Sequence, residues 1–366
     1  MGTFAVLGGG HGGGHGGGHG GGHGGGHGRA GSQSPELADQ VLVSAALIST
    51  QRGIASPEGI DAFASPAIHP VGRAGAAEFA RWDPGLHSYI VLPQLLRPLD
   101  FAPNGGDALT LSAFGQPALT LVRPSERRFR AEIGVVMDEA MKRADRHDEI
   151  LVQNQNSMPF WAALVPLSPE RCRHTMILLG VAMEFTMHVQ MRFKHEFACW
   201  RPFELSPQVQ PMIGTPRHGA FPMGHGCEAA VVAGLLAALT RPSSSAGTRA
   251  WQIMTAQFDK LAQRMADNRV IAGVHYPIDS SGGFALGKWI VAYLQRMASG
   301  HGGGYAFHHC RFDAQDLEVE RRATAYRDIT IALGEDDGAK PRIEPVPAWQ
   351  QMFGRARAEW PANAPS

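Results

Sequence analysis

Three short segments of this 366-residue chain carry the residue types that chemistry on a charged substrate requires. They are residues 194–202 (KHEFACWRP), 222–225 (PMGH) and 269–279 (RVIAGVHYPID). Lys194 and Arg201 lie seven positions apart, which is two turns of a helix, so we expect both side chains on one face. Two cations on one face of an otherwise apolar helix are costly to bury unless an anion lies between them.

The other two segments add an anion-binding backbone and an oriented histidine. Gly224 and His225 open an apolar helix, whose first N–H groups favour an anion, and the glycine lets that anion approach the backbone. Arg269 adds a planar, permanent cation suited to tetrahedral oxyanions. His275 and Asp279 are four positions apart, so the carboxylate can accept from one ring nitrogen and leave the other as a nucleophile or metal ligand. Together the segments predict a site for a tetrahedral oxyanion.

The order and separation of these motifs resemble the signature of the vanadium-dependent haloperoxidases and the type-2 phosphatidic acid phosphatase superfamily. That signature reads K-x6-R-P, then P-S-G-H, then S-R-x5-H-x3-D. Here 19 residues separate Pro202 from Pro222 and 43 separate His225 from Arg269, which fits the spacing of the family. The resemblance covers roughly residues 130–300 and implies a mainly α-helical fold, the helical bundle of the haloperoxidases and acid phosphatases.

The resemblance assigns several residues to the oxygens of the bound anion. Lys194, Arg201 and Arg269 resemble the cations that hold the equatorial oxygens of vanadate or phosphate. Gly224 resembles the glycine whose backbone N–H donates to the same oxygens. Met223 stands where the family has a serine whose hydroxyl also donates to the anion, and a thioether cannot donate. We therefore expect weakened oxyanion binding, and we predict that Met223→Ser tightens vanadate binding.

The resemblance also implies the acid–base and metal-ligand roles. His225 resembles the general acid/base histidine. His275 resembles the histidine that bonds vanadium in the peroxidases and attacks phosphorus in the phosphatases, and Asp279 resembles its orienting partner. His218 lies in a segment similar to the halide-side loop of the peroxidases, where bromoperoxidases have a histidine. Asn268 replaces the serine before the arginine of the family, which is a mild change between small polar residues.

The resemblance favours a vanadate-dependent haloperoxidase that oxidises bromide or iodide with hydrogen peroxide. Vanadate, bound at His275, is the expected cofactor, and no nucleotide cofactor is expected. The alternative is a soluble acid phosphatase that hydrolyses a phosphate ester, with His275 as nucleophile and His225 as general acid. A third hypothesis is an oxyanion-binding relative whose turnover is reduced by Met223. Helical haloperoxidases often form dimers or larger assemblies, so the resemblance also implies a homo-oligomer.

The composition excludes several other classes. Lysine plus arginine equals aspartate plus glutamate at 33 each, so we expect no nucleic-acid partner. Hydrophobic residues make up 44% of the chain, and the four cysteines contain no CxxC pair, so a buried core is expected rather than a disulfide scaffold. A membrane-spanning helix needs about 20 apolar residues, and the most apolar run, residues 229–239, is shorter than that. Because the N-terminus shows no signal-peptide pattern, we expect a cytoplasmic protein.

Apolar periodicity predicts a chain of helices with one β-hairpin. The helices are expected over residues 37–51, 125–151, 173–200, 224–238, 248–269, 282–297 and 313–333, and the hairpin over 108–122. The predicted buried face of the second helix consists of Ile133, Val136, Met137, Ala140, Met141 and Ala144. We expect four regions: a disordered Gly- and His-rich tail over 1–29, a mostly helical region packed on the core over 30–125, the catalytic core over 126–300, and a C-terminal extension over 301–366.

Overall fold

The computed structural model describes residues 42, 44–49, 79, 82–243, 245, 247–299, 307–315, 326, 329 and 345–360. The chain divides into two compact units, one that includes Asp83–Ser366 and one that spans Gly17–Trp82. In the second unit, residues 44–49 are helical, within the helix predicted over 37–51. The tail predicted over 1–29 lies outside the described residues.

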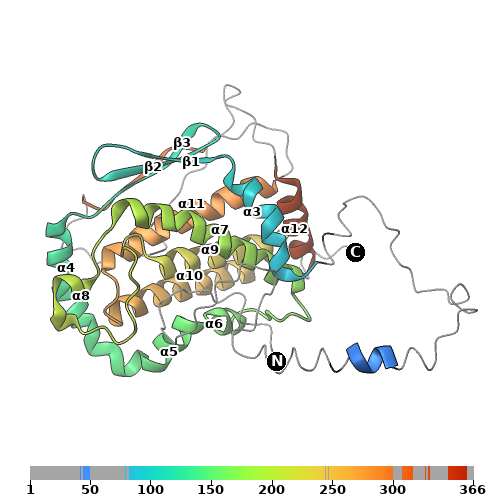
Figure 1. Cartoon of the computed structure of the whole chain (residues 1–366), viewed down its shortest axis with the longest axis horizontal. Helices are drawn as coiled ribbons and strands as arrows, with labels where there is room; N and C mark the ends of the chain where they lie inside the picture. Colours follow the sequence, from blue (N-terminus) through green and yellow to red (C-terminus); the bar gives the residue numbers. More distant parts are fainter. Residues whose placement is uncertain are drawn as a thin grey trace, which may run out of the picture. The chain divides into compact units, whose positions relative to one another are not determined.

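Four long helices run side by side and form the bundle (Figure 1). They are α7 (Arg173–Phe197), α9 (Gly224–Leu239), α10 (Thr248–Ile271) and α11 (Pro277–Ala298). Helix α9 packs against the other three. Its sequence, GHGCEAAVVAGLLAAL, is apolar on nearly every face, as expected for a helix with neighbours all round. Helices α9 and α11 can approach closely because residue 283 is a glycine: a Cβ there would lie 2.5 Å from the Met223 carbonyl oxygen.

A small sheet packs on the bundle. Strands β1 (Leu99–Pro103), β2 (Ala108–Ala113) and β3 (Gln116–Val122) are antiparallel, and β4 (Cys310–Asp313) pairs with β3 in parallel. The hairpin predicted over 108–122 is confirmed as β2–β3. Phe101 of β1 lies against Phe193 of α7, with ring centroids 5.6 Å apart, so aromatic contacts join sheet and bundle. The predicted start of the helix over 313–333 is wrong, because Asp313 is the last residue of strand β4. Most of that range lies outside the described residues.

The single helix predicted over 125–151 is in fact two helices. Helix α4 (Glu126–Glu139) is followed by a 3-10 turn (Ala140–Lys142) and then by α5 (Arg143–Gln155). The predicted buried face is also wrong: Met141 is 85% exposed, and of the six predicted residues Val136 is the fully buried one. The buried side of α4 instead carries Phe129 and Glu132 together with Val136. Relative to the prediction α4 is rotated about its axis, so that the carboxylate of Glu132 lies on the buried side.

Shorter elements complete the unit. They are a 3-10 turn (Pro84–Leu86), α3 (His87–Leu96), α6 (Met158–Ala162), α8 (Pro202–Leu205), a second 3-10 turn (Pro207–Val209) and α12 (Pro347–Ala358). The mainly α fold class is confirmed, with the small sheet added to it. Among the residues that the structure describes, no helix is both long enough and apolar enough to cross a membrane.

Candidate active site

The candidate active site lies where the ends of four bundle helices meet. The last turns of α7 and α10 carry cations, while the first turns of α9 and α11 present backbone N–H groups and their positive dipole ends. Both arrangements favour a negative charge between them. We call this set the oxyanion site; it consists of Lys194, Arg201, Gly224, His225, Arg269, His275 and Asp279.

The prediction that Lys194 and Arg201 share one face of a single helix is wrong. Helix α7 ends at Phe197, and Ala198 is left-handed (φ 44°), so Arg201 is not on the helix of Lys194. The two cations nevertheless converge, because Lys194 Nζ donates to the Gly219 carbonyl at 3.0 Å and Arg201 Nη2 donates to the same oxygen at 3.3 Å. The loop comes this close because residue 219 is glycine: a Cβ there would lie 3.0 Å from the Lys194 carbonyl oxygen.

Arg201, His275 and Asp279 form a continuous chain of hydrogen bonds. Arg201 Nη1 lies 2.8 Å from His275 Nε2, and His275 Nδ1 lies 2.9 Å from Asp279 Oδ2. A guanidinium can only donate, so Nε2 is the acceptor and Nδ1 carries the ring proton. Asp279 Oδ2 also accepts from the backbone N–H of Tyr276 at 3.0 Å, which fixes the carboxylate. The tautomer is therefore the one expected from the spacing of the two residues.

Arg269 is held from the side of α5. Its Nη2 donates to the Ile150 carbonyl at 3.0 Å and its Nη1 to Asn154 Oδ1 at 3.4 Å. Its Nε is buried and has no hydrogen-bond partner among the described residues. The neighbouring Asn268 turns away to α5, where its Nδ2 donates to Gln153 Oε1 at 2.9 Å. Asn268 therefore joins α10 to α5.

The two remaining histidines differ in how they are held. His225 is partly exposed, but its Nε2 is buried and has no partner within the described ranges. His218 lies beside the site, with Nδ1 at 3.2 Å from Arg201 Nη2, and its carbonyl accepts from the same nitrogen at 3.2 Å. Both predicted histidines are thus close to the cations of the oxyanion site.

Met223 packs between two helices. It is fully buried, and its sulfur accepts from the Ser280 hydroxyl of α11 at 3.8 Å. A Cβ at Gly226 would lie 3.4 Å from the same sulfur. The Met223 backbone N–H donates to the Asp279 carbonyl at 2.9 Å, which ties the start of α9 to α11. The thioether therefore fills the α9–α11 interface.

Burial sets the charge states of the site. Lys194, Arg201 and Arg269 are each 1–2% exposed. Burial lowers the pKa of both arginines to about 10, so both stay cationic at neutral pH. Burial, followed by the charge of Arg201, also lowers the pKa of Lys194. Burial is the main cause of all three shifts, and only for Lys194 does a neighbouring cation add to it.

The histidines and the carboxylate respond to the same surroundings. Burial and then the charge of Arg269 lower the pKa of His225 well below its ordinary value, and burial and then Arg201 do the same for His275. Burial raises the pKa of Asp279, although the Tyr276 N–H and Arg201 oppose the shift. Both histidines are therefore neutral at pH 7 in the ligand-free protein.

Sequence reasoning missed a pair of polar residues beside the site. Gln190 of α7 donates from Nε2 to Glu228 Oε1 of α9 at 3.1 Å, and burial raises the pKa of Glu228. A Cβ at Gly224 would lie 3.4 Å from Gln190 Oε1. Both side chains stand in apolar helical segments, and nothing in their spacing marks them as partners.

Comparison with known proteins adds no assignment. No known protein-family model matches the chain, and no curated protein matches it significantly. The function of the chain is therefore inferred from the geometry and charge of the oxyanion site.

Proposed function

We propose that this chain is a vanadate-dependent haloperoxidase-like enzyme that oxidises bromide or iodide with hydrogen peroxide. The observation that carries the proposal is the hydrogen-bonded chain from Arg201 through His275 to Asp279, in a site that contains two further buried cations. The arrangement of α7, α9, α10 and α11, which brings the three sequence motifs together, supports a helical-bundle haloperoxidase/acid phosphatase-like fold.

The residues of the oxyanion site fit a tetrahedral dianion. Its seven residues include three cations and one carboxylate, so a dianion balances their charge. His225 Nε2 and Arg269 Nε are both buried and lack partners among the described residues. Buried polar atoms are normally hydrogen-bonded, so these two atoms point to a ligand with several oxygens. Vanadate and phosphate both meet that requirement.

In this proposal the cations and one backbone group hold the oxygens of vanadate. Lys194, Arg201, Arg269 and the N–H of Gly224 would contact the oxygens, and His275 Nε2 would be the ligand to vanadium. When bound, vanadate supplies a Lewis acid that activates hydrogen peroxide toward the halide. In the ligand-free protein Arg201 Nη1 donates to the single lone pair of His275 Nε2, so with vanadate bound Arg201 would donate to an anion oxygen instead.

The other side chains control protons and the approach of the halide. Asp279 keeps the ring proton of His275 on Nδ1, which leaves Nε2 available. A bound anion offsets the cations that lower the pKa of His225, so His225 can hold a proton beside the reacting oxygens. His218, whose Nδ1 lies 3.2 Å from Arg201 Nη2, is suited to the halide side of the site.

Phosphomonoester hydrolysis is the second candidate function, because a neutral His275 can also act as a nucleophile. In that reaction His275 Nε2 forms a bond to phosphorus as the ester P–O bond breaks, and the leaving oxygen takes a proton from His225. Water then attacks the phosphohistidine, breaks the N–P bond and releases phosphate. An oxyanion-binding relative without turnover is the third candidate, because Met223 brings no hydroxyl to the site.

A peroxide assay with and without added vanadate separates these functions. We expect bromination of a phenol dye that depends on vanadate, bromide and hydrogen peroxide, and we expect His275→Ala to abolish it. His195→Ala is the matched control, since His195 is exposed on α7 next to Lys194. Hydrolysis of p-nitrophenyl phosphate by the vanadate-free protein, without any bromination, would assign the phosphatase. Vanadate binding without either turnover would assign the binding protein.

A further inference from the structure

Glu132 of α4 is a buried carboxylate that lies against the start of α11. It is 1% exposed, and its Oε2 accepts from the backbone N–H of Ile278 at 3.1 Å. Its Oε1 accepts from Arg128 Nε at 2.7 Å, and Arg128 Nη2 lies 2.7 Å from the same oxygen. Ile278 is the residue before Asp279. A fully buried ion pair thus ends on the turn that carries the orienting carboxylate of the oxyanion site.

The start of α11 needs an acceptor from outside. The first N–H groups of a helix have no partner within the helix, and a Ser, Thr, Asp or Asn side chain before the helix usually accepts one of them. Here the residue at that position is Tyr276, whose ring instead packs on Phe129, with centroids 4.6 Å apart. Glu132 therefore supplies the oxygen that the local sequence lacks at Ile278.

This contact bears on the orientation of His275. Asp279 uses one oxygen, Oδ2, for both the Tyr276 N–H and the His275 ring proton. Without Glu132, the N–H of Ile278 would have no acceptor in a buried turn. The nearest carboxylate in that turn is Asp279, and a rotation of Asp279 toward Ile278 would take Oδ2 away from His275.

We propose that Glu132 is a positioning residue for the His275–Asp279 pair, which it acts on through the N–H of Ile278. The inference deepens the proposed function and rests on it for its effect on turnover. The effect on the hydrogen bond between His275 and Asp279 does not depend on any activity. The effect on turnover and the effect on the hydrogen bond can therefore be tested separately.

The test compares two double variants, because a single change at Glu132 would leave the buried Arg128 without its carboxylate. Arg128→Met with Glu132→Gln keeps an oxygen for the Ile278 N–H, whereas Arg128→Met with Glu132→Met removes it. Replacing a whole buried ion pair by apolar residues of similar volume is often neutral for stability, so the Met-containing variant is expected to fold. The Gln-containing variant keeps the hydrogen bond to Ile278 and is expected to fold as well. The two variants differ at position 132 by an amide, whose oxygen can accept from Ile278, against a thioether, which offers that N–H no comparable acceptor.

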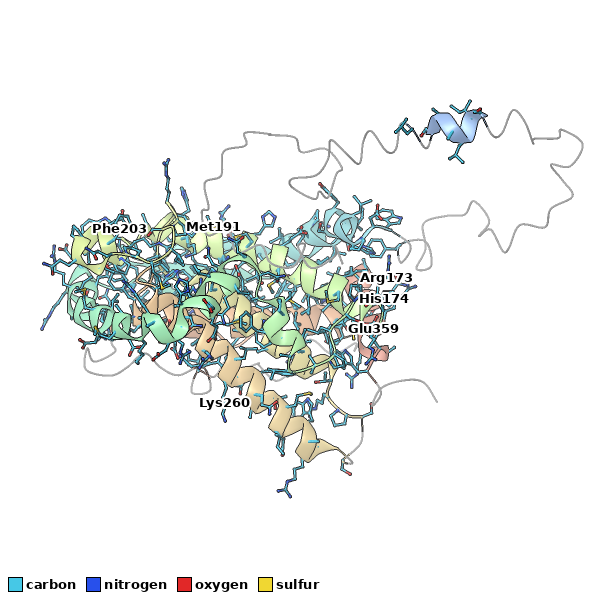
Figure 2. The ribbon with its side chains drawn as sticks, turned by 90° about the horizontal axis from the view of Figure 1, so that it is seen from below. Arg173, His174, Met191, Phe203, Lys260 and Glu359 are labelled. Carbon is cyan, nitrogen blue, oxygen red and sulfur yellow. The ribbon has the colours of Figure 1, made fainter. Side chains whose placement is uncertain are left out.

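A carboxylate elsewhere in the fold provides the control. Glu359, beside His174 in Figure 2, accepts from the N–H groups of His174 at 2.7 Å and Thr175 at 2.8 Å at the start of α7. Glu359→Met therefore removes a helix-capping carboxylate of the same kind, at a helix start that does not carry His275. Any general effect of lost helix capping will appear in this variant too.

The primary readout is the far-downfield proton NMR signal of the His275 Nδ1–H, assigned by its loss in His275→Gln. We expect the signal in the Gln-containing double variant and in Glu359→Met, and its loss in the Met-containing double variant. In the vanadate-loaded enzyme we expect kcat of the Met-containing variant to fall about tenfold with KM nearly unchanged. An equal signal in both double variants would overturn the proposal, as would an equal loss in Glu359→Met. If the parent protein shows no turnover, the NMR comparison still decides the role of Glu132.

Discussion

Replacing Asp279 with asparagine removes one negative charge from the oxyanion site and keeps the shape of the side chain. Both hydrogen bonds that position the carboxylate end on a single oxygen, at 2.9 Å from His275 Nδ1 and 3.0 Å from the Tyr276 nitrogen. The amide oxygen of Asp279→Asn can take both of them. We therefore expect the variant to fold with His275 in the same tautomer, so that charge is the main difference.

The size of the effect follows from the distance between the carboxylate and the bound anion. Asp279 Oδ2 is 2.9 Å from His275 Nδ1, and crossing the ring and one further bond reaches the central atom of the anion. The separation is about 7 Å, which at an effective dielectric constant of about 20 corresponds to about 2 kcal/mol per unit charge. For each unit of charge on the bound anion, oxyanion affinity should rise by up to about 30-fold. Because burial raises the pKa of Asp279, its charge is incomplete in the free protein and this value is an upper bound.

The same substitution should slow turnover. A neutral amide polarises His275 less than a carboxylate does, and loss of such a partner typically costs about 10–100-fold in rate. Tungstate titration by calorimetry and the peroxide assay measure the two effects separately. Glu139→Gln, at the end of α4, makes the same change in net charge as a control. Weaker tungstate binding in Asp279→Asn, with the fold intact, would refute the view that Asp279 opposes the anion electrostatically.

Three further predictions concern protons and packing. Burial and neighbouring cations lower the pKa of Lys194 and His225, and a bound anion offsets those cations, so binding takes up protons. Tungstate affinity should therefore rise between pH 8 and pH 6, by up to about tenfold per pH unit for each proton. A tungstate affinity that calorimetry finds independent of pH would contradict this. Met223→Ser should lower the free energy of unfolding by about 2–5 kcal/mol in urea denaturation, because the side chain is fully buried, and vanadate titration then tests whether a serine hydroxyl tightens binding. Gly283→Ala should cost about 1–3 kcal/mol, because its Cβ would lie 2.5 Å from a backbone oxygen of α9, whereas Gly134→Ala, with nothing within 4 Å, should not destabilise the protein.

Local features of the site were predictable from the sequence. The His275–Asp279 hydrogen bond follows from a four-residue spacing across the start of a helix, where a carboxylate in the first turn reaches back. The start of α9 at Gly224 and the hairpin over 108–122 were predictable for the same reason. In each case the deciding contacts join residues that are close in the chain, so spacing alone carries the information.

Contacts between distant segments were not predictable in this way. Periodicity placed the wrong side of α4 in the core, because the buried side is the one that meets the start of α11, and there Glu132 accepts from Ile278. The convergence of Lys194 and Arg201 depends on the Gly219 carbonyl, which belongs to a loop 18 positions beyond Arg201.

By itself the sequence indicated which residues could hold an oxyanion, and it determined the local pairing that orients His275. Only the tertiary structure decided that Met223 fills a helix interface, that Arg201 donates to His275 Nε2, and that α4 contributes a carboxylate to the start of α11. The physical reason is that helix periodicity specifies which side chains share a face, while the neighbours of that face depend on how the whole chain packs.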